Sequence, residues 1–143
     1  MGMIVDPITD GIVLDHIKAG LGMQLYKILR LNELPCAVAM IMNADSRKMG
    51  RKDIIKISAV IDLDLDVIGY VDPDITINII QNGRVVKRTN LEPPERVVDV
   101  IRCRNPRCIT STEQELPQIF RLTDREHRVY RCLYCDSRAK SAE

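Results

Sequence analysis

The chain has 143 residues, of which 45% are hydrophobic and 29% are charged, and its formal net charge is +1. This length allows one ordinary domain or two small ones, and the composition is typical of a soluble globular protein. With a near-neutral net charge, one phenylalanine and no tryptophan, the chain has neither the strongly basic composition nor the aromatic platforms that are typical of nucleic-acid-binding proteins. No apolar run approaches the roughly 20 residues that cross a bilayer, so we expect neither nucleic acid nor membrane as a partner.

The first elements are aliphatic strands and one amphipathic helix. Residues 11–17 (GIVLDHI) predict a strand, because branched aliphatic residues follow a glycine. On a regular strand Asp15 and His16 point to opposite faces, so we do not expect them to act as an acid–base pair. Apolar residues at helical spacing predict a helix over residues 19–30 that packs on the sheet, and the continuous apolar run 36–42 predicts a buried strand.

A further strand, residues 52–57, carries two lysines on one face. Alternation places Lys52, Ile54 and Lys56 on one side, and Asp53 with the intervening isoleucines on the other. Two lysines on one face can hold an anion. A solvated sheet face has the same pattern, and on the pattern alone we favour that simpler interpretation.

The following segment predicts a helix and then a hairpin. Asp62 is the expected N-cap of a helix over LDLDVIGY, and residues 72–73 (Asp-Pro) end it. Strands at 75–81 and 84–88 flank Asn82-Gly83, a dipeptide typical of two-residue hairpin turns. The order strand, helix, strand, strand, helix, strand, strand predicts an α+β fold. We expect a ferredoxin-like α/β sandwich with one additional strand.

A proline pair separates this region from the rest of the chain. Residues 91–96 (LEPPER) can continue neither a helix nor a central strand. We therefore expect one domain over residues 1–90, a linker over 91–96 and a second domain over 97–143. Within the second domain, a small all-β module is predicted by short strands at 97–101, 119–123 and 128–132.

The second domain carries four cysteines in a C-x4-C and C-x2-C arrangement, namely Cys103, Cys108, Cys132 and Cys135. This spacing predicts one tetrahedral zinc site, and four protein ligands leave no position for activated water. Two disulfides or free thiols are the alternative. The opening MGMIVDPITD lacks the basic and apolar regions of a secretory signal, so we expect a cytoplasmic protein, in which disulfides are rare.

Several segments together resemble the regulatory chain of aspartate carbamoyltransferase. They are GIVLDHI (11–17), MGRKDIIKI (49–57), TINII (76–80), EPPERV (92–97) and the cysteine frame with CLYC. The resemblance covers nearly the whole chain and implies a non-catalytic subunit in pyrimidine biosynthesis. It implies that the first domain binds CTP or UTP as inhibitors and ATP as activator, with or without Mg²⁺. The domain with one structural zinc ion would then dock the catalytic chain.

The resemblance also implies an assembly and individual residue roles. The expected assembly joins two catalytic trimers and three regulatory homodimers. The implied nucleotide-binding residues are Val5, Asp6, Ile8, Asp15, His16, Lys52, Ile54, Lys56, Asn78, Ile80, Val85 and Arg88. The implied contacts to the catalytic chain are Asn105, Arg107 and Asp136.

Two other functions compete with this interpretation. A zinc-ribbon nucleic-acid-binding protein would use the arginines around the cysteines, Arg102, Arg104, Arg107, Arg128 and Arg131. The near-neutral charge and few aromatic residues argue against it. An enzyme would have to use Asp15 and His16 beside the lysines, and this arrangement lacks a nucleophile and an open metal position.

Overall fold

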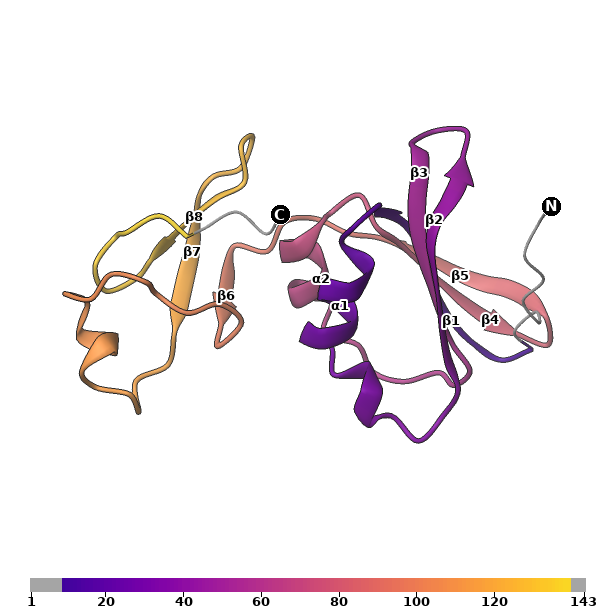
Figure 1. Ribbon diagram of the computed structural model, residues 1–143, viewed down its shortest axis with the longest axis horizontal. Coiled ribbons are helices and arrows are strands. Elements are labelled where there is room, and N and C mark those ends of the chain that lie inside the picture. The colour runs from indigo at the N-terminus through magenta and orange to yellow at the C-terminus, as the bar shows by residue number, and fades with distance from the viewer. Residues whose placement is uncertain (1–8, 140–143) are drawn as a thin grey trace.

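The computed structural model describes residues 9–139 as two β-sheets joined by a proline-containing segment (Figure 1). The elements of the first part are β1 (Gly11–Lys18), α1 (Gly22–Ile28), β2 (Val38–Ser46), β3 (Gly50–Ile57), α2 (Leu65–Val71), β4 (Thr76–Gln81) and β5 (Arg84–Asn90). The second part contains β6 (Arg96–Val98), β7 (Ile119–Asp124) and β8 (Val129–Cys132). Short 3-10 helices span Leu31–Glu33 and Ile109–Ser111. None of the helices described is long and apolar enough to span a membrane.

The first sheet has the strand order β2-β3-β1-β4-β5, and all its neighbouring strands are antiparallel. The first four strands in this order form the ferredoxin-like arrangement, and β5 extends it beside β4. Both helices lie on one face of this sheet (Figure 1). The predicted α+β sandwich with an additional strand is therefore confirmed, as is the small all-β second sheet.

Aliphatic side chains from alternate strand positions fill the space between the sheet and the helices. Leu14 of β1 and Ile55 of β3 pair across the sheet, and each is completely buried. They pack in one core with Leu25 of α1 and Ile68 of α2, which are also completely buried. Among residues 9–139 no helix covers the other face of the sheet (Figure 1), so this face is the one open to a ligand.

Three local predictions were wrong in detail. The first helix covers only Gly22–Ile28 of the predicted 19–30, because Gly20 with a φ of 100° forms the turn before it. Asp64 rather than Asp62 caps α2, since its carboxylate accepts hydrogen bonds from the N–H groups of Asp66 and Val67. The strand predicted as buried over 36–42 begins at Val38 and forms a half-exposed edge of the sheet.

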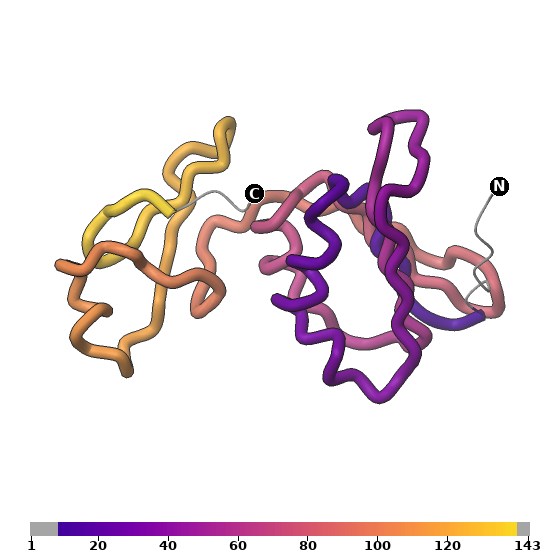
Figure 2. Tube along the Cα trace, in the orientation of Figure 1, coloured from indigo at the N-terminus to yellow at the C-terminus, as the bar shows by residue number. Residues whose placement is uncertain are grey.

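The predicted hairpin is confirmed at Asn82 and Gly83. Their φ values of 53° and 75° are those required by a two-residue turn that follows the right-handed twist of the strands. The turn joins β4 to β5, and the proline-containing segment follows directly after the C-terminal end of β5. Figure 2 follows the chain from this hairpin past the helices into the second sheet.

The second sheet has the order β6-β7-β8 and packs against the helical layer of the first part. Phe120 and Tyr130 are the large buried residues of this small core. Tyr130 also contacts Tyr70 of α2, with the two ring centroids 4.8 Å apart in an edge-to-face arrangement. The helices thus lie between the first sheet and the second (Figure 1).

Candidate metal centre and nucleotide-binding face

The four predicted cysteine ligands converge on one point. Their sulfur atoms all lie within 4.8 Å of one another, with 3.6 Å between Cys103 and Cys135 and 3.8 Å between Cys108 and Cys132. Four sulfurs placed about 2.3 Å from a central ion in a tetrahedron are separated by roughly 3.8 Å. The donor set therefore fits a metal ion bound by four thiolates, with three of the cysteines buried and Cys135 half-buried.

Polar groups around the sulfurs hold them in place. The hydroxyl of Thr110, which is almost completely buried, donates a hydrogen bond to the sulfur of Cys108 at 3.2 Å. Nδ2 of Asn105 donates to the hydroxyl of Ser137 at 3.2 Å and so joins the loop of the first cysteine pair to that of the second. Sequence reasoning did not identify Thr110 or Ser137. The only available signal was a hydroxyl residue two positions after a cysteine, which is too common to be specific.

The thiols differ in their readiness to ionise. Burial raises the pKa of Cys103 to about 12 and also raises the pKa of Cys132. Burial opposes ionisation of Cys135 as well, but hydrogen bonds with Ser137 and Asn105 outweigh it and lower the pKa of Cys135 to about 6. A bound cation is therefore needed to keep Cys103 and Cys132 as thiolates at neutral pH, and metal binding releases protons.

The predicted nucleotide-binding residues that the structure describes lie together on the uncovered face of the first sheet. The strand register places Lys56 of β3, Asn78 of β4 and Arg88 of β5 in one row, with Val13 of β1 between the first two. Directly paired residues share a face of a sheet, and alternation then adds the neighbours in each strand. The residues gathered in this way are Asp15, His16, Lys52, Ile54, Lys56, Asn78, Ile80, Val85 and Arg88.

A β-bulge places Asp15 and His16 on the same side, which corrects the expectation of opposite faces. Leu14 pairs with Ile55 and Ile17 pairs with Asp53, so Asp15 and His16 together oppose a single residue of β3. His16 adopts a φ of 58°, and its Nδ1 lies 3.1 Å from the hydroxyl of Thr76. Sequence periodicity misses such a bulge because one extra residue breaks the two-residue repeat.

The polar side chains of this face are ordered by contacts with one another. Nζ of Lys52 forms an ion pair with Oδ1 of Asp15 at 2.9 Å, and both side chains are less than a quarter exposed. Nε of Arg88 donates to Oδ1 of Asn78 at 3.0 Å. Lys56 forms no ion pair with any residue in 9–139, so its charge is available to an anionic ligand. The predicted residues Val5, Asp6 and Ile8 lie outside the described residues.

A buried carboxylate lies behind this face, on the side of β3 opposite the lysines, and the sequence indicated no function for it. Asp53 is completely buried, and its two oxygens accept hydrogen bonds from the backbone N–H groups of Gly20, Gly22 and Asn43 at 3.0–3.1 Å. A side chain on Gly22 would approach Oδ2 of Asp53 to 2.8 Å. Asp53 therefore fixes the start of α1 and the bend in β2 relative to β3, on which Lys52 and Lys56 stand.

The predicted interface residues lie around the metal knuckles. Arg107 is exposed, and its backbone N–H donates to Oδ1 of Asn105 at 3.0 Å. Asp136 is exposed directly after Cys135, and its carboxylate lies 3.3 Å from Nη2 of Arg121. Asn105 and Asp136 thus have structural contacts within the module, and their role toward a partner remains a prediction.

These features define a two-domain α+β protein with a polar, cation-bearing sheet face and a four-cysteine metal-binding module. Residues 3–92 match the family model "Aspartate carbamoyltransferase regulatory chain, allosteric domain", and residues 95–143 match the model for the metal binding domain of the same chain. The chain belongs to the aspartate carbamoyltransferase regulatory chain family. It is therefore a regulatory rather than a catalytic chain, as the resemblance implied, and the nucleic-acid-binding alternative gains no support.

Curated relatives match along nearly the whole length. An aspartate carbamoyltransferase regulatory chain from Clostridium tetani is 49% identical over 142 residues, which cover 99% of both chains. One from Clostridium botulinum (strain Hall) is 48% identical over 134 residues, which cover 94% of this chain and 92% of the relative. One from Bifidobacterium longum is 42% identical over 138 residues, which cover 96% and 99% of the two chains.

Proposed function

We propose that this chain senses CTP, UTP and ATP, with or without Mg²⁺, and passes their occupancy to the catalytic chain of aspartate carbamoyltransferase. In this proposal residues 1–90 bind the nucleotide, residues 91–96 link the domains, and residues 97–143 hold one Zn²⁺ and dock the catalytic chain. The assembly joins two catalytic trimers and three regulatory homodimers in the cytoplasm.

The observation that supports the nucleotide site is that the candidate residues lie on the same face of four adjacent strands. Nine residues from β1, β3, β4 and β5 lie together there although they are spread from position 15 to position 88. A nucleoside triphosphate needs cations for its phosphates and aliphatic or backbone surfaces for its base. Lys56 and Arg88 provide cations in one row, and Ile54, Ile80 and Val85 provide aliphatic surface.

The carboxylate in this face suits a ribose rather than a phosphate. Asp15 is already neutralised by Lys52 at 2.9 Å, so an approaching triphosphate does not meet an unpaired negative charge. The remaining acceptor capacity of its carboxylate is suited to a sugar hydroxyl. His16, held near Thr76 by the bulge, lies on the same face and offers a further ring nitrogen to the phosphates.

The metal supports docking by fixing the knuckle loops. Zinc is the proposed ion because four thiolates in tetrahedral geometry are its usual structural set. The module has few large buried side chains, so metal binding should supply much of its folding free energy. Without the ion, Asn105, Arg107 and Asp136 would lose the loop geometry that presents them.

Regulation requires that nucleotides bind the two quaternary states with unequal affinity, since a ligand shifts an equilibrium only by its differential affinity. ATP and CTP can therefore compete for one site and act in opposite directions. The proposal does not require the chain itself to perform any chemical step.

The test separates the two domains. Lys56→Ala should weaken CTP binding about tenfold through loss of a charge-assisted contact, as measured by calorimetry, while the complex with catalytic trimers still forms. Lys48→Ala, in the exposed turn between β2 and β3, is the matched control and should leave CTP binding unchanged. Removal of the metal by a chelator should abolish the complex. Unaltered CTP binding by Lys56→Ala would refute the nucleotide site.

A further inference from the structure

Four arginines stand in one row across the second sheet. Arg96 of β6 pairs with Arg121 of β7, and Arg121 pairs with Arg131 of β8. An isolated bridge then pairs Arg131 with Arg138. Directly opposed residues share a face, so these four side chains, the arginine row, leave the sheet on the side opposite Phe120 and Tyr130.

Such a row is unfavourable in the isolated chain, because like charges directly opposite each other destabilise a sheet. The acid that faces it is Asp136, whose carboxylate contacts Arg121 at 3.3 Å and whose carbonyl accepts from Arg131 at 3.1 Å. Arg96 and Arg138 have no ion pair or side-chain hydrogen bond within residues 9–139. The row therefore carries positive charge that the described part of the chain does not neutralise.

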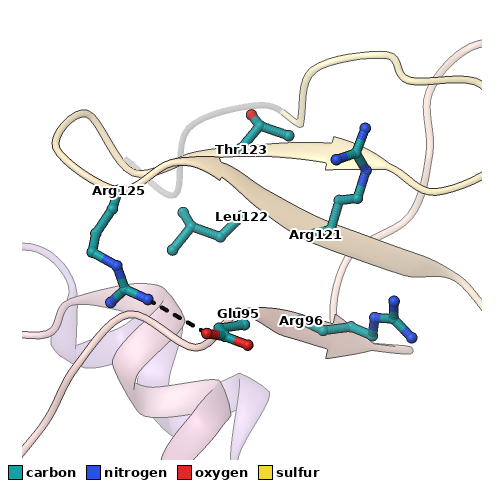
Figure 3. Close-up of a pocket in the computed structure, with 6 residues that line it drawn as sticks. All are labelled: Glu95, Arg96, Arg121, Leu122, Thr123 and Arg125. Carbon is teal, nitrogen blue, oxygen red and sulfur yellow. Dashed lines mark ion pairs between the residues drawn. The ribbon is translucent and has the colours of Figure 1, made fainter.

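A cleft opens at one end of the row. It has a volume of about 460 Å³ and is lined by Glu95, Arg96, Arg121, Leu122, Thr123 and Arg125. Figure 3 shows the side chains of Arg96 and Arg121 together at one end, and Arg125 with Glu95 at the other. The Arg125–Glu95 distance is 4.0 Å and the Glu95 side chain is 91% exposed, so this pair is easily opened by a competing carboxylate.

We propose that the arginine row recognises an acidic surface of the catalytic chain, an inference that rests on the proposed function. Neighbouring strands are about 4.8 Å apart, so four positions span roughly 14 Å, which exceeds the size of a phosphate group and suits several carboxylates on a protein surface. Arginine matches carboxylates through its planar fork. The row also adjoins the second metal knuckle through Asp136, which continues the surface predicted to dock the catalytic chain.

This arrangement also links the metal to the charge pattern. Asp136 follows the ligand Cys135 directly and adopts a φ of 64°, and its backbone N–H donates to the carbonyl of Cys132 at 2.8 Å. The knuckle therefore fixes the acid that orients Arg121 and Arg131. The metal-loaded module presents the arginines as an ordered row.

The test uses the metal-loaded full-length chain and isolated catalytic trimers. The double variant Arg96→Glu/Arg138→Glu changes two exposed residues, and the control Arg47→Glu/Arg84→Glu makes the same change of charge on exposed residues of the first domain. We expect association of the unmodified chain to slow as salt is raised from about 20 to 200 mM. The row variant should associate about tenfold more slowly at low salt and lose most of this salt dependence.

The outcomes separate this inference from the proposed function. Row and control variants that associate alike, or a rate that does not depend on salt, would overturn the arginine row while leaving docking itself intact. If the unmodified chain formed no complex with catalytic trimers at any salt concentration, both the proposed function and this inference would be refuted. If inorganic pyrophosphate bound the row while the row variant assembled normally, the ligand would be a small anion, and the docking role of the row would be overturned. Metal content and circular dichroism of both variants confirm that they are folded.

Discussion

The phenolic rings of Tyr70 and Tyr130 meet edge to face with centroids 4.8 Å apart, and they join α2 of the first part to β8 of the second. The hydroxyl of Tyr130 donates a hydrogen bond of 2.6 Å to the carbonyl of Pro94 in the connecting segment. Burial, aided by the neighbouring Tyr70, raises the pKa of Tyr130 to about 12, so this donor keeps its proton at neutral pH. Helix, connecting segment and metal module are thereby held by one buried side chain.

Tyr130→Phe should destabilise the junction between the two parts. It keeps the ring contact with Tyr70 but leaves the buried carbonyl of Pro94 without its donor, which costs about 1–3 kcal/mol. We expect this loss in the free energy of unfolding measured by urea denaturation. Tyr134→Phe removes the hydroxyl of an exposed tyrosine and should change the stability by less than about 0.5 kcal/mol. Equal stability of the two variants would contradict the proposed role of this hydrogen bond.

Asp53→Ala should destabilise the first domain strongly. The substitution leaves three backbone N–H groups near α1 and β2 without their charged acceptor, and we expect a loss of about 3 kcal/mol or more. Asp53→Asn keeps one acceptor oxygen and should cost less. Asp45→Ala, at an exposed position of β2, is the control and should be nearly neutral. Thermal unfolding of the three variants measures the difference, and a loss for Asp53→Ala no larger than that of the control would refute this account.

The ion pair between Asp15 and Lys52 should make the sheet face sensitive to acid. Burial alone would raise the pKa of Asp15, but hydrogen bonds from Lys52 and from the backbone of His16 outweigh it and hold the pKa below its usual 3.8. Because the folded-state pKa is the lower one, ionised Asp15 stabilises the fold above about pH 4, and this contribution disappears as pH falls through the folded-state pKa.

Lys52→Met should therefore raise the pKa of Asp15, as followed by NMR titration of its carboxyl carbon. The reason is that burial remains while the main stabilising cation is removed. Lys48→Met, which removes an exposed charge from the turn between β2 and β3, should leave the titration unchanged. A pKa of Asp15 that is the same in Lys52→Met as in the unmodified chain would show that the ion pair does not hold it down.

Thr110→Val should weaken metal binding without changing the ligands. Valine has nearly the same shape as threonine but cannot donate the hydrogen bond to Cys108, and loss of such an outer contact typically lowers metal affinity about 10- to 100-fold. Competition with a chromophoric chelator measures the affinity. Thr112→Val removes an exposed hydroxyl that donates to the carbonyl of Ile109 and serves as the control. Similar affinities for the two variants would exclude this role of Thr110.

The sequence predicted the features that depend on short spacing. The cysteine pairs, the Asn82-Gly83 turn and the alternation in β3 are local patterns, and each led to the structure observed. The bulge at Asp15 and His16 could not be predicted, because it depends on how β1 pairs with β3. The choice of Asp64 rather than Asp62 as the N-cap of α2 could not be predicted either, because both aspartates precede the same apolar stripe. The contact between Tyr70 and Tyr130 joins residues far apart in the chain, and no local pattern indicates it.

The path of β5 has a mechanical consequence. This strand carries Arg88, ends at Asn90 and continues directly into the residues before Pro93 and Pro94. Proline fixes φ, which restricts the backbone of this segment. The segment is also packed closely on α2, because a side chain added to Gly69 would approach the carbonyl oxygen of Glu92 to 2.6 Å. Under the proposed function, a nucleotide that binds Arg88 would displace β5, and the covalent backbone would transmit this displacement to the metal-binding module without passing through the helical layer.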